Sequence, residues 1–274
     1  MLIALLGCNA DKIDSGQQTN GRLSFLTYNV HGLPPEITGD DTTIRMSQIA
    51  PLLNAFDVVG LQEDFIDSNH DILKSSSLHT EHFRFSDSIE ERIYGSGLSV
   101  FSNPPIIAHE GIHFETCHGT VDNASDCLAS KGFQWATLNL GGQRLHLYNT
   151  HKEAGGSNED EIARASQVTQ LVSHINANTS EEAVLFLGDT NLHPDDPVDI
   201  PLIESLMSST DLLDSCANVN CSELNHIDRL LFRSSDTLAL EIEQWTNENT
   251  FYDSNGSPLS DHPALSIQVK WDSQ

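Results

Sequence analysis

The sequence predicts an α/β fold in which two packed, mixed β-sheets are flanked by helices. Short apolar or alternating runs, bounded by Gly, Pro, Asn and Asp, recur along the chain and are typical of strands. Two longer segments between them carry apolar residues at helical spacing. No linker, repeat or low-complexity tract divides the 274 residues, and 38% apolar residues suffice for a full core. We therefore expect one domain over residues 22–274, preceded by a separate segment, residues 1–21.

The expected strands are recognised by their hydrophobic patterns. Residues 183–186 form a continuous apolar run, which is typical of a buried strand. Near the end of the chain, Leu265, Ile267, Val269 and Trp271 alternate strictly, as expected of a strand with one face in the core. The full set of expected strands lies near residues 22–30, 57–62, 97–102, 133–139, 144–150, 183–188, 227–232 and 264–271.

Three segments are predicted to be helical. Thr42 or Thr43 can cap a helix that runs to Phe56. A second helix begins near Ser157, where acidic residues in the first turn are favourable at the positive end of the helix dipole. A shorter helix is expected over residues 201–209. The apolar residues of the first two helices are Ile44, Ile49, Leu52 and Leu53, and Ile162, Ala165, Val168, Leu171, Val172 and Ile175.

Polar residues stand at the ends of six predicted strands. Asp189 and Asn191 follow a buried strand two positions apart, so on an extended backbone both side chains can point to one side. Such a pair can orient a water, bind a metal or hold a phosphoryl oxygen, although an Asp-capped turn fits the pattern equally well. Convergence at one sheet edge, where ligands tend to bind in α/β folds, is the economical explanation. The other strand-end residues are Asn29, Glu63, His151, Asp228, Asp261 and His262.

Taken in their order along the chain, these motifs resemble the endonuclease/exonuclease/phosphatase superfamily. The resemblance extends from about Leu23 to Trp271, nearly the whole chain. This fold is shared by type I deoxyribonucleases, abasic-site endonucleases, inositol-polyphosphate phosphatases and neutral sphingomyelinases, and the bacterial neutral sphingomyelinase-like enzymes are the most similar in character. The resemblance implies a four-layer α/β/β/α sandwich and metal-dependent hydrolysis of phosphodiester bonds.

Glu63 is the candidate metal ligand. A hard carboxylate suits Mg²⁺, which binds proteins through one or two carboxylates; Mn²⁺ and Ca²⁺ are alternatives. The resemblance adds Asn29 at the metal or the phosphate and places Asp261 beside the metal. Considered by position alone, Glu63 would be an ordinary surface carboxylate at a strand end.

His262 is the candidate general base, because a neutral imidazole near pH 7 can take a proton from water. The resemblance assigns the orientation of His262 to Asp228, the positioning of the attacking water to Asp189, and a phosphoryl oxygen to Asn191. His151 would stabilise the transition state or protonate the leaving group.

Lys131 is a further candidate for contact with the substrate phosphate. It precedes a predicted strand, and it resembles a lysine that several phosphodiesterases of this family place near the phosphate; a solvated lysine is the alternative. Arg164 and Arg229 are interpreted as structural ion partners, and the role of His193 stays open. The remaining histidines interpreted as core or solvated residues are His31, His70, His79, His82, His109, His146 and His174.

The charge pattern favours a lipid substrate. A net charge of −27 argues against a surface that binds polyanions, because nucleic-acid affinity depends on Lys and Arg. We therefore expect a monomeric, sphingomyelinase-type phosphodiesterase that touches a membrane through Trp245, Phe251 and Tyr252, although ordinary packing would also explain these rings. An extracellular nuclease is the alternative, followed by an inositol-phosphate phosphatase and an inactive binding lipoprotein.

The N-terminus and the cysteines predict export. Residues 5–8 resemble a bacterial lipobox in which Cys8 is lipidated, although the basic region that usually comes first is missing. A late start assignment or a chance match would explain that departure. In an exported protein the other cysteines are expected to form Cys117–Cys127 and Cys216–Cys221 bridges. A zinc site with nearby histidines, His113, His118 and His226, is the rival interpretation.

Overall fold

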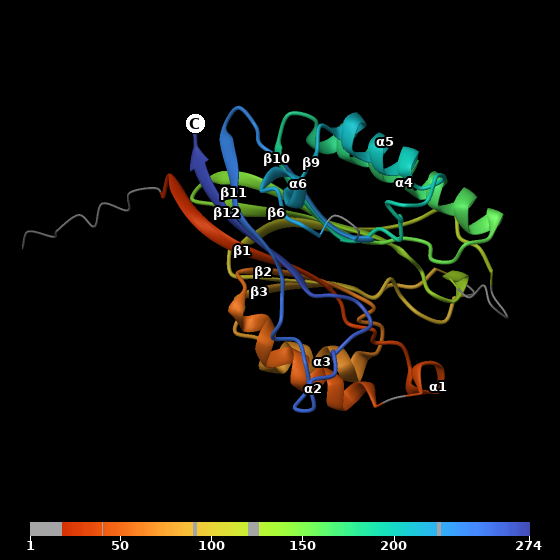
Figure 1. Ribbon diagram of the computed structural model, residues 1–274. Coiled ribbons are helices and arrows are strands. Elements are labelled where there is room, and N and C mark those ends of the chain that lie inside the picture. Colours follow the sequence, from red (N-terminus) through yellow and green to blue (C-terminus); the bar gives the residue numbers. More distant parts are fainter. Residues whose placement is uncertain (1–17, 40, 90–91, 120–125, 224–225) are drawn as a thin grey trace, which may run out of the picture.

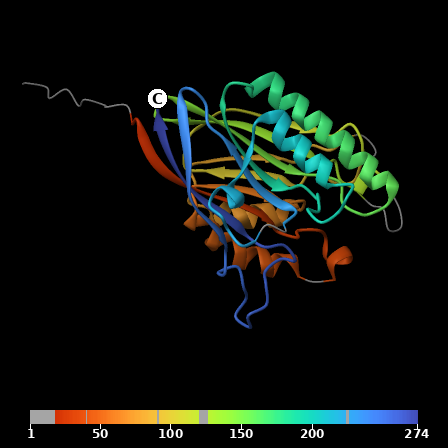
Figure 2. The same ribbon diagram turned by 45° about the horizontal axis from the view of Figure 1, so that its top comes forward.

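A computed structural model of the protein describes residues 18–39, 41–89, 92–119, 126–223 and 226–274. Two six-stranded sheets pack face to face, and helices cover the outer face of each sheet (Figure 1). The same four layers are visible in a tilted view (Figure 2). The α/β/β/α sandwich implied by the resemblance is confirmed.

The first sheet has the strand order β11-β12-β1-β2-β4-β3. The strands β1 and β2 are parallel, and the other neighbours are antiparallel. The bounds are β1 (Asn20–Asn29), β2 (Val58–Gln62), β3 (Glu81–Phe85), β4 (Leu98–Ser102), β11 (Leu238–Asn247) and β12 (Leu265–Ser273).

The second sheet has the order β5-β6-β7-β8-β10-β9, with β7 and β8 parallel. The bounds are β5 (Ile106–His113), β6 (Gly132–Leu140), β7 (Gln143–His151), β8 (Ala183–Asp189), β9 (Leu213–Asp214) and β10 (Asp228–Arg233).

Helices cover both outer faces and build three apolar clusters. The helices α2 and α3 cover the first sheet, α4 and α5 cover the second, and a third cluster fills the space between the sheets. The bounds are α1 (Pro35–Thr38), α2 (Thr42–Leu52), α3 (Asp67–Ser76), α4 (Asn158–Thr179), α5 (Ile200–Thr210) and α6 (Ser215–Asn218), with 3-10 turns η1 (Leu53–Ala55) and η2 (Asp126–Leu128). Among the described residues, no helix combines the length and apolarity that a bilayer span requires.

The eight predicted strands and three predicted helices are all present, and the additional elements have weaker patterns. The helix α2 ends at Leu52 and continues as η1, close to the expected end at Phe56. The strand β5 is mostly exposed, so it lacks a hydrophobic pattern. The helix α3 has polar composition and buries only Asn69, His70 and Leu73. The strand β11 is the exception among the additional elements. Its Leu238, Leu240 and Ile242 alternate inward, so a strand pattern was present there and was missed.

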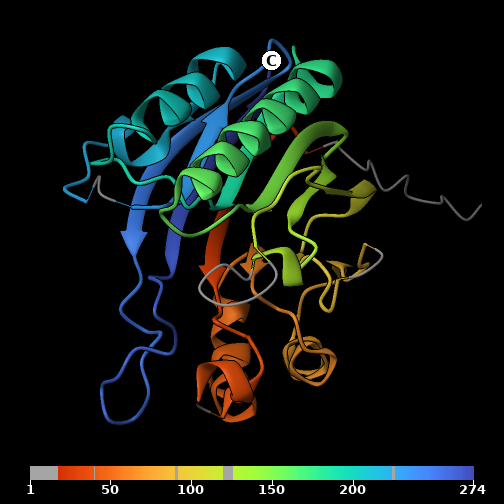
Figure 3. The same ribbon diagram turned by 90° about the vertical axis from the view of Figure 1, so that its right-hand side faces the viewer.

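Strand pairing brings the predicted polar residues to one edge of the molecule. In the parallel pair β1–β2, Asn29 lies beside Gln62, one residue before Glu63. In the second sheet, Asp189 lies between His151 of β7 and Asp228 of β10. This edge faces the viewer in Figure 3.

Both expected disulfides are present. Cys117 bonds to Cys127 with a Cα–Cα distance of 5.4 Å, and Cys216 bonds to Cys221 with a Cα–Cα distance of 5.0 Å. Because the four sulfurs are bonded in two pairs, they are not available as zinc ligands, and the interpretation of these cysteines as a zinc site is wrong. The predicted lipidation site Cys8 lies outside the described residues.

Close packing of the two sheets predicts the effect of a substitution at Gly60. A Cβ at this position of β2 would overlap Leu187 Cδ1 and approach Asn149, both in the opposite sheet. We expect Gly60→Ala to lower the free energy of unfolding by about 1–3 kcal/mol, measured by urea denaturation. The control is Gly156→Ala, whose added Cβ meets nothing within 4 Å. Equal stabilities of the two variants would contradict this account of sheet packing.

Candidate active site

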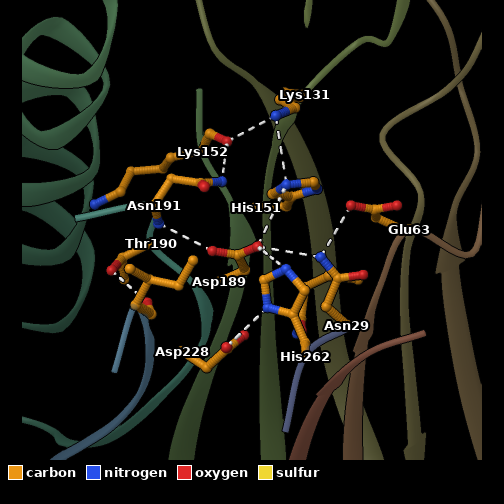
Figure 4. Close-up of polar contacts among 12 residues, drawn as sticks. Asn29, Glu63, Lys131, His151, Lys152, Asp189, Thr190, Asn191, Asp228 and His262 are labelled. Atoms are coloured by element: carbon orange, nitrogen blue, oxygen red, sulfur yellow. Dashed lines mark hydrogen bonds and ion pairs between the residues drawn. The ribbon is translucent and has the colours of Figure 1, made fainter. Parts of the chain in front are cut away.

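The strand ends surround a cleft of about 240 Å³ with one polar and one apolar wall. The polar wall brings together most of the residues that the sequence singled out, and Asn29 and Asp228 lie directly behind them (Figure 4). Its members are Glu63, Lys131, His151, Asp189, Asn191 and His262. The apolar wall comes from loops and is made of Leu33, Ile37, Phe65, Tyr94, Leu128, Ala129 and Ala154.

Asn29 joins carboxylates of the two sheets. Its amide nitrogen donates to Glu63 Oε1 at 3.0 Å and to Asp189 Oδ2 at 3.1 Å, while its amide oxygen accepts from the backbone N–H of His31. Glu63 Oε2 is buried and has no hydrogen-bond partner. Burial raises the pKa of Glu63, and the hydrogen bond from Asn29 and the charge of Lys131 offset only part of that effect. Neighbouring charge therefore compensates the ionised carboxylate only in part.

His262 and Asp228 form a hydrogen-bonded pair next to Asp189. His262 Nδ1 lies 2.9 Å from Asp228 Oδ2, and His262 Nε2 lies 3.7 Å from Asp189 Oδ2. Burial alone would lower the pKa of His262, but the bond to Asp228 and the charges of Asp228 and Asp189 outweigh it and raise the pKa to about 10. Burial and the charge of Asp189 also raise the pKa of Asp228. The pair thus shares one proton, which imidazole, the stronger base, retains.

Ligand atoms of Asp189, Asp228 and His262 lie within 4.8 Å of one another. They could hold an ion as a group, but Asp228 Oδ2 already accepts a hydrogen bond from His262. Glu63 Oε2, by contrast, is a carboxylate oxygen at the cleft without a hydrogen-bond partner.

A second network organises the groups around His151. Lys131 Nζ lies 3.4 Å from His151 Nε2 and donates to the backbone oxygen of Lys152 at 2.8 Å. Asn191 Nδ2 donates to the same oxygen at 3.0 Å, and the Asn191 N–H donates to Asp189 Oδ1. Burial lowers the pKa of His151 well below its usual range, and Lys131 and His262 lower it further. His151 is therefore a neutral imidazole in this structure.

Uncommon backbone conformations are concentrated at the site. Five non-glycine residues among those described have positive φ, and three of them are His31 (49°), Glu63 (61°) and Asn191 (48°). This left-handed region costs a residue with a Cβ about 1 kcal/mol or more, least for Asn. Packing and hydrogen bonds must hold these residues in place.

A buried polar cluster supports the strand end that carries Glu63. Asp64 Oδ2 accepts from Ser99 Oγ at 2.6 Å and contacts His70 Nδ1 at 2.5 Å. Arg84 donates to the backbone oxygens of Asp64 and Phe65. The interpretation of His70 as a core residue is confirmed, because its exposed fraction is 6%.

His31 is a site residue that the sequence interpretation missed. Its Nδ1 lies 3.1 Å from Asp261 Oδ1, and this hydrogen bond, partly opposed by burial, lowers the pKa of Asp261 to about 2. Asp261 lies outside the lining of the cleft and borders a neighbouring hollow, so in this structure its partner is His31. The positive φ of His31, directly after the β1 motif, cannot be read from residue type.

The other polar predictions have different outcomes. Arg164 Nε pairs with Asp199 at 3.1 Å, and Arg229 lies 3.7 Å from Asp214, so both arginines are ion partners as expected. His193 borders a separate surface hollow rather than the cleft.

Only one of the three rings expected at a membrane is well exposed. Phe251 is 3% exposed and packs against Tyr28 with a centroid distance of 4.8 Å. Trp245 is half-buried and stacks on His226. Tyr252 is 49% exposed. Core packing, the alternative interpretation, therefore explains Phe251, and Tyr252 is the ring of the three that is well exposed.

Known proteins resemble this chain in sequence. The pattern of the Endonuclease/Exonuclease/phosphatase family matches residues 26–262. The sphingomyelinase of Mycobacterium tuberculosis is 27% identical over 268 residues, which cover 90% of this chain and 52% of that protein. Human sphingomyelin phosphodiesterase 2 is 27% identical over 279 residues, which cover 89% of this chain and 63% of that protein. The chain thus spans about half the length of the mycobacterial relative.

Solved structures share the fold. Sphingomyelinase C from Streptomyces griseocarneus superimposes with a TM-score of 0.68 and 21% identity, covering 90% of this chain and 99% of that one. Staphylococcus aureus beta toxin with bound magnesium ions gives 0.64 and 15%, covering 93% and 100%. D. rerio TDP2 with a single-strand DNA product gives 0.64 and 17%, covering 90% and 98%. At these identities the likeness concerns the fold.

Lys152, next to the site, has a buried ammonium group without a partner. Its exposed fraction is 0%, and its Nζ makes no hydrogen bond. Burial lowers the pKa of Lys152 to about 7, and the charge of Arg229 contributes. No sequence pattern signals the burial of this side chain, because Lys152 directly follows a predicted strand and would normally be solvated.

We expect Lys152→Met to stabilise the protein, because methionine removes an unpaired buried charge of similar length. The gain in unfolding free energy should be about 1–3 kcal/mol at and below pH 7. Between pH 7 and 10.5 the unfolded wild type binds a proton that the folded wild type does not, so wild-type stability rises and the gain vanishes.

Urea denaturation across this pH range measures the difference. Lys270→Met, which removes an exposed lysine paired with Glu241, is the control and should not give a gain confined to lower pH. A loss of stability in Lys152→Met would contradict the unpaired state of the ammonium.

Proposed function

This chain belongs to the endonuclease/exonuclease/phosphatase family, and on that premise we propose that it is a metal-dependent phosphodiesterase of sphingomyelinase type. One observation carries the proposal. A carboxylate with a free, buried oxygen and a His–Asp pair face one cleft from opposite sides of Asp189. Hydrolysis of a phosphodiester needs charge neutralisation and an activated water, and these two features can supply them.

The residues at Glu63 fit a divalent cation. The oxygen Glu63 Oε2 has no partner, and the carboxylate is held by Asn29 from one side only. Oxygen donors of this kind suit Mg²⁺, with Mn²⁺ or Ca²⁺ as alternatives. When bound, such an ion supplies positive charge for the phosphoryl oxygens and lowers the pKa of nearby bases. Glu63 would hold it, and Asn29 would orient Glu63. Asp261 stays a predicted neighbour of the ion, linked to the site through His31.

His262 acts as the general base in this proposal. Asp228 fixes the ring through Nδ1 and stabilises the imidazolium that forms when Nε2 takes a proton from water. Asp189 faces His262 Nε2 and accepts from Asn29, so its carboxylate can orient that water. The acidic neighbours that raise the pKa of His262 to about 10 favour the imidazolium, so His262 must lose a proton before it can act as the base. A divalent cation beside it would lower its pKa in that direction.

Lys131, Asn191 and His151 form the phosphate side of the cleft. Lys131 and Asn191 both donate to the oxygen of Lys152, which holds their side chains at the cleft wall. An ammonium and a carboxamide are both donors of the kind that phosphoryl oxygens accept from. Because burial and Lys131 keep His151 neutral, we propose that it stabilises the transition state by N–H donation rather than by releasing a proton.

A phospholipid is the substrate class that the chain supports best. The net charge of −27 disfavours a polynucleotide, and relatives at 27% identity are named sphingomyelinase and sphingomyelin phosphodiesterase. The apolar wall gives the cleft a surface for hydrocarbon beside the phosphate-handling groups. The two disulfides favour an exported protein.

Substrate comparison tests this function. Purified protein with MgCl₂ or EDTA would be offered sphingomyelin, plasmid DNA and inositol phosphates. We expect Mg²⁺-dependent release of phosphocholine, and a fall in kcat by about 10²–10⁴ in His262→Ala because the general base is lost. The matched control is His109→Ala, at an exposed histidine of β5. DNA nicking without lipid hydrolysis, or full activity of His262→Ala, would contradict the proposal.

Metal binding is testable without activity. MgCl₂ should raise the melting temperature of the wild type, because ligands that bind the folded state add about 1–3 kcal/mol when well above their Kd. Glu63→Gln should lose most of this shift, since it removes the charge but keeps the shape. Glu159→Gln, at an exposed acid of α4, is the control. Equal shifts in all three proteins would place the ion elsewhere.

A further inference from the structure

Apolar side chains continue from the cleft wall onto the surface on one side of the site. Five of them line the cleft itself, and the sixth borders the adjoining hollow with Pro34 and Pro35. We refer to this set as the apolar lip, and its members are Leu33, Ile37, Phe65, Ile93, Tyr94 and Leu128. The helix α1, which carries Ile37, projects from the active edge at the right of Figure 1.

The outermost members of the lip are unusually exposed. Ile37 is 56% exposed and Ile93 is 66% exposed. The lip also contains the rings of Phe65 and Tyr94, whose centroids lie 6.0 Å apart in a tilted arrangement. Single exposed aliphatic residues are common on soluble proteins, but a set that leads from solvent to a polar cleft indicates a binding surface.

We propose that the apolar lip receives the hydrocarbon of a phospholipid still held in a bilayer, with Ile37 and Ile93 touching the bilayer surface. The inference rests on the proposed function for the chemistry at the phosphate. The proposed membrane contact is a different surface from the segment that contains Trp245, Phe251 and Tyr252. Tyr252 borders a separate hollow.

The net negative charge of the chain indicates which lipid headgroups the bilayer should carry. With 40 acidic and 13 basic side chains, the protein is repelled by anionic lipid and by nucleic acid alike. Lys131 is the sole Lys or Arg that lines the cleft within the described part of the chain. Attraction must therefore come from apolar contact, which favours an electroneutral, zwitterionic surface.

Vesicle binding tests the lip separately from catalysis. Cosedimentation with phosphatidylcholine vesicles in EDTA would compare the wild type with Ile37→Asp and Ile93→Asp. We expect each substitution to lower the partition coefficient at least about tenfold, because a charge replaces buried hydrocarbon. Ile162→Asp is the matched control, since Ile162 is 69% exposed on α4, and its binding should stay within about twofold of the wild type. Milder variants, Ile37→Ser and Ile93→Ser, and melting temperatures check that folding is intact.

Rates of hydrolysis distinguish a role of the apolar lip in membrane contact from a role in cleavage of the phosphodiester bond. With MgCl₂, the ratio of sphingomyelin-vesicle hydrolysis to bis(4-nitrophenyl) phosphate hydrolysis should fall about tenfold in the Ile37 and Ile93 variants. Absence of all phosphodiester cleavage would contradict the proposed function. Vesicle binding that depends on Ile37 and Ile93 would still support the proposed membrane contact of the apolar lip.

Three results would contradict the proposed membrane contact of the apolar lip. The first is wild-type vesicle binding that the lip variants leave unchanged. The second is loss of binding in Tyr252→Asp alone. The third is cleavage of single-stranded DNA that depends on the lip, because stacking of bases on Phe65 and Tyr94 would then be its purpose.

Discussion

The Asn29 amide is the interaction on which the rest of the site depends. It stands at the end of β1 in one sheet and binds carboxylates from both sheets, Glu63 and Asp189. Two sheets that pack through apolar side chains can slide, because such contacts are non-directional. A directional bond between their edges fixes the separation of the metal-ligand candidate from the water-orienting carboxylate. The close approach of Gly60 to Leu187 below it limits the same movement.

Negative charge is concentrated at this edge. It explains why His262 keeps a proton and why the pKa of Asp228 is raised. Glu63, Asp189 and Asp228 are acidic groups at one buried edge, and their mutual repulsion must be compensated. His262 compensates Asp228 by keeping a proton, whereas nothing bonded to Glu63 Oε2 does the same. The backbone of Glu63 is itself left-handed, a conformation that packing and hydrogen bonds must hold in place. The contrast between Asp228 and Glu63 is the reason that the proposed function assigns the cation to Glu63 and proton transfer to His262.

The sequence was informative wherever a functional residue ends a strand. Asn29, His151 and Asp189 each follow an apolar run, and strand pairing alone brings them together. It was uninformative where function depends on loops. Ile37 and Tyr94 are separated by more than fifty residues and share no periodic pattern, so their meeting in one wall is a tertiary property. The burial of Lys152 is likewise set by neighbouring elements rather than by its own position.

This division between strands and loops also explains why the substrate is harder to infer than the reaction. Rigid strand ends hold the groups that handle phosphate, and these groups meet the same chemical requirements whichever alcohol leaves. The apolar wall beside them comes from the segments that follow β1, β2, β3, β5 and β7, and under the proposed function it contacts the remainder of the substrate. In this chain that wall is aliphatic and aromatic, and the charge outside it is strongly negative. Under the proposed function, a polynucleotide would meet few cations here, Lys131 in the cleft and Arg84 in the adjoining hollow, and repulsion outside them. A zwitterionic lipid would use the apolar contact that this wall provides.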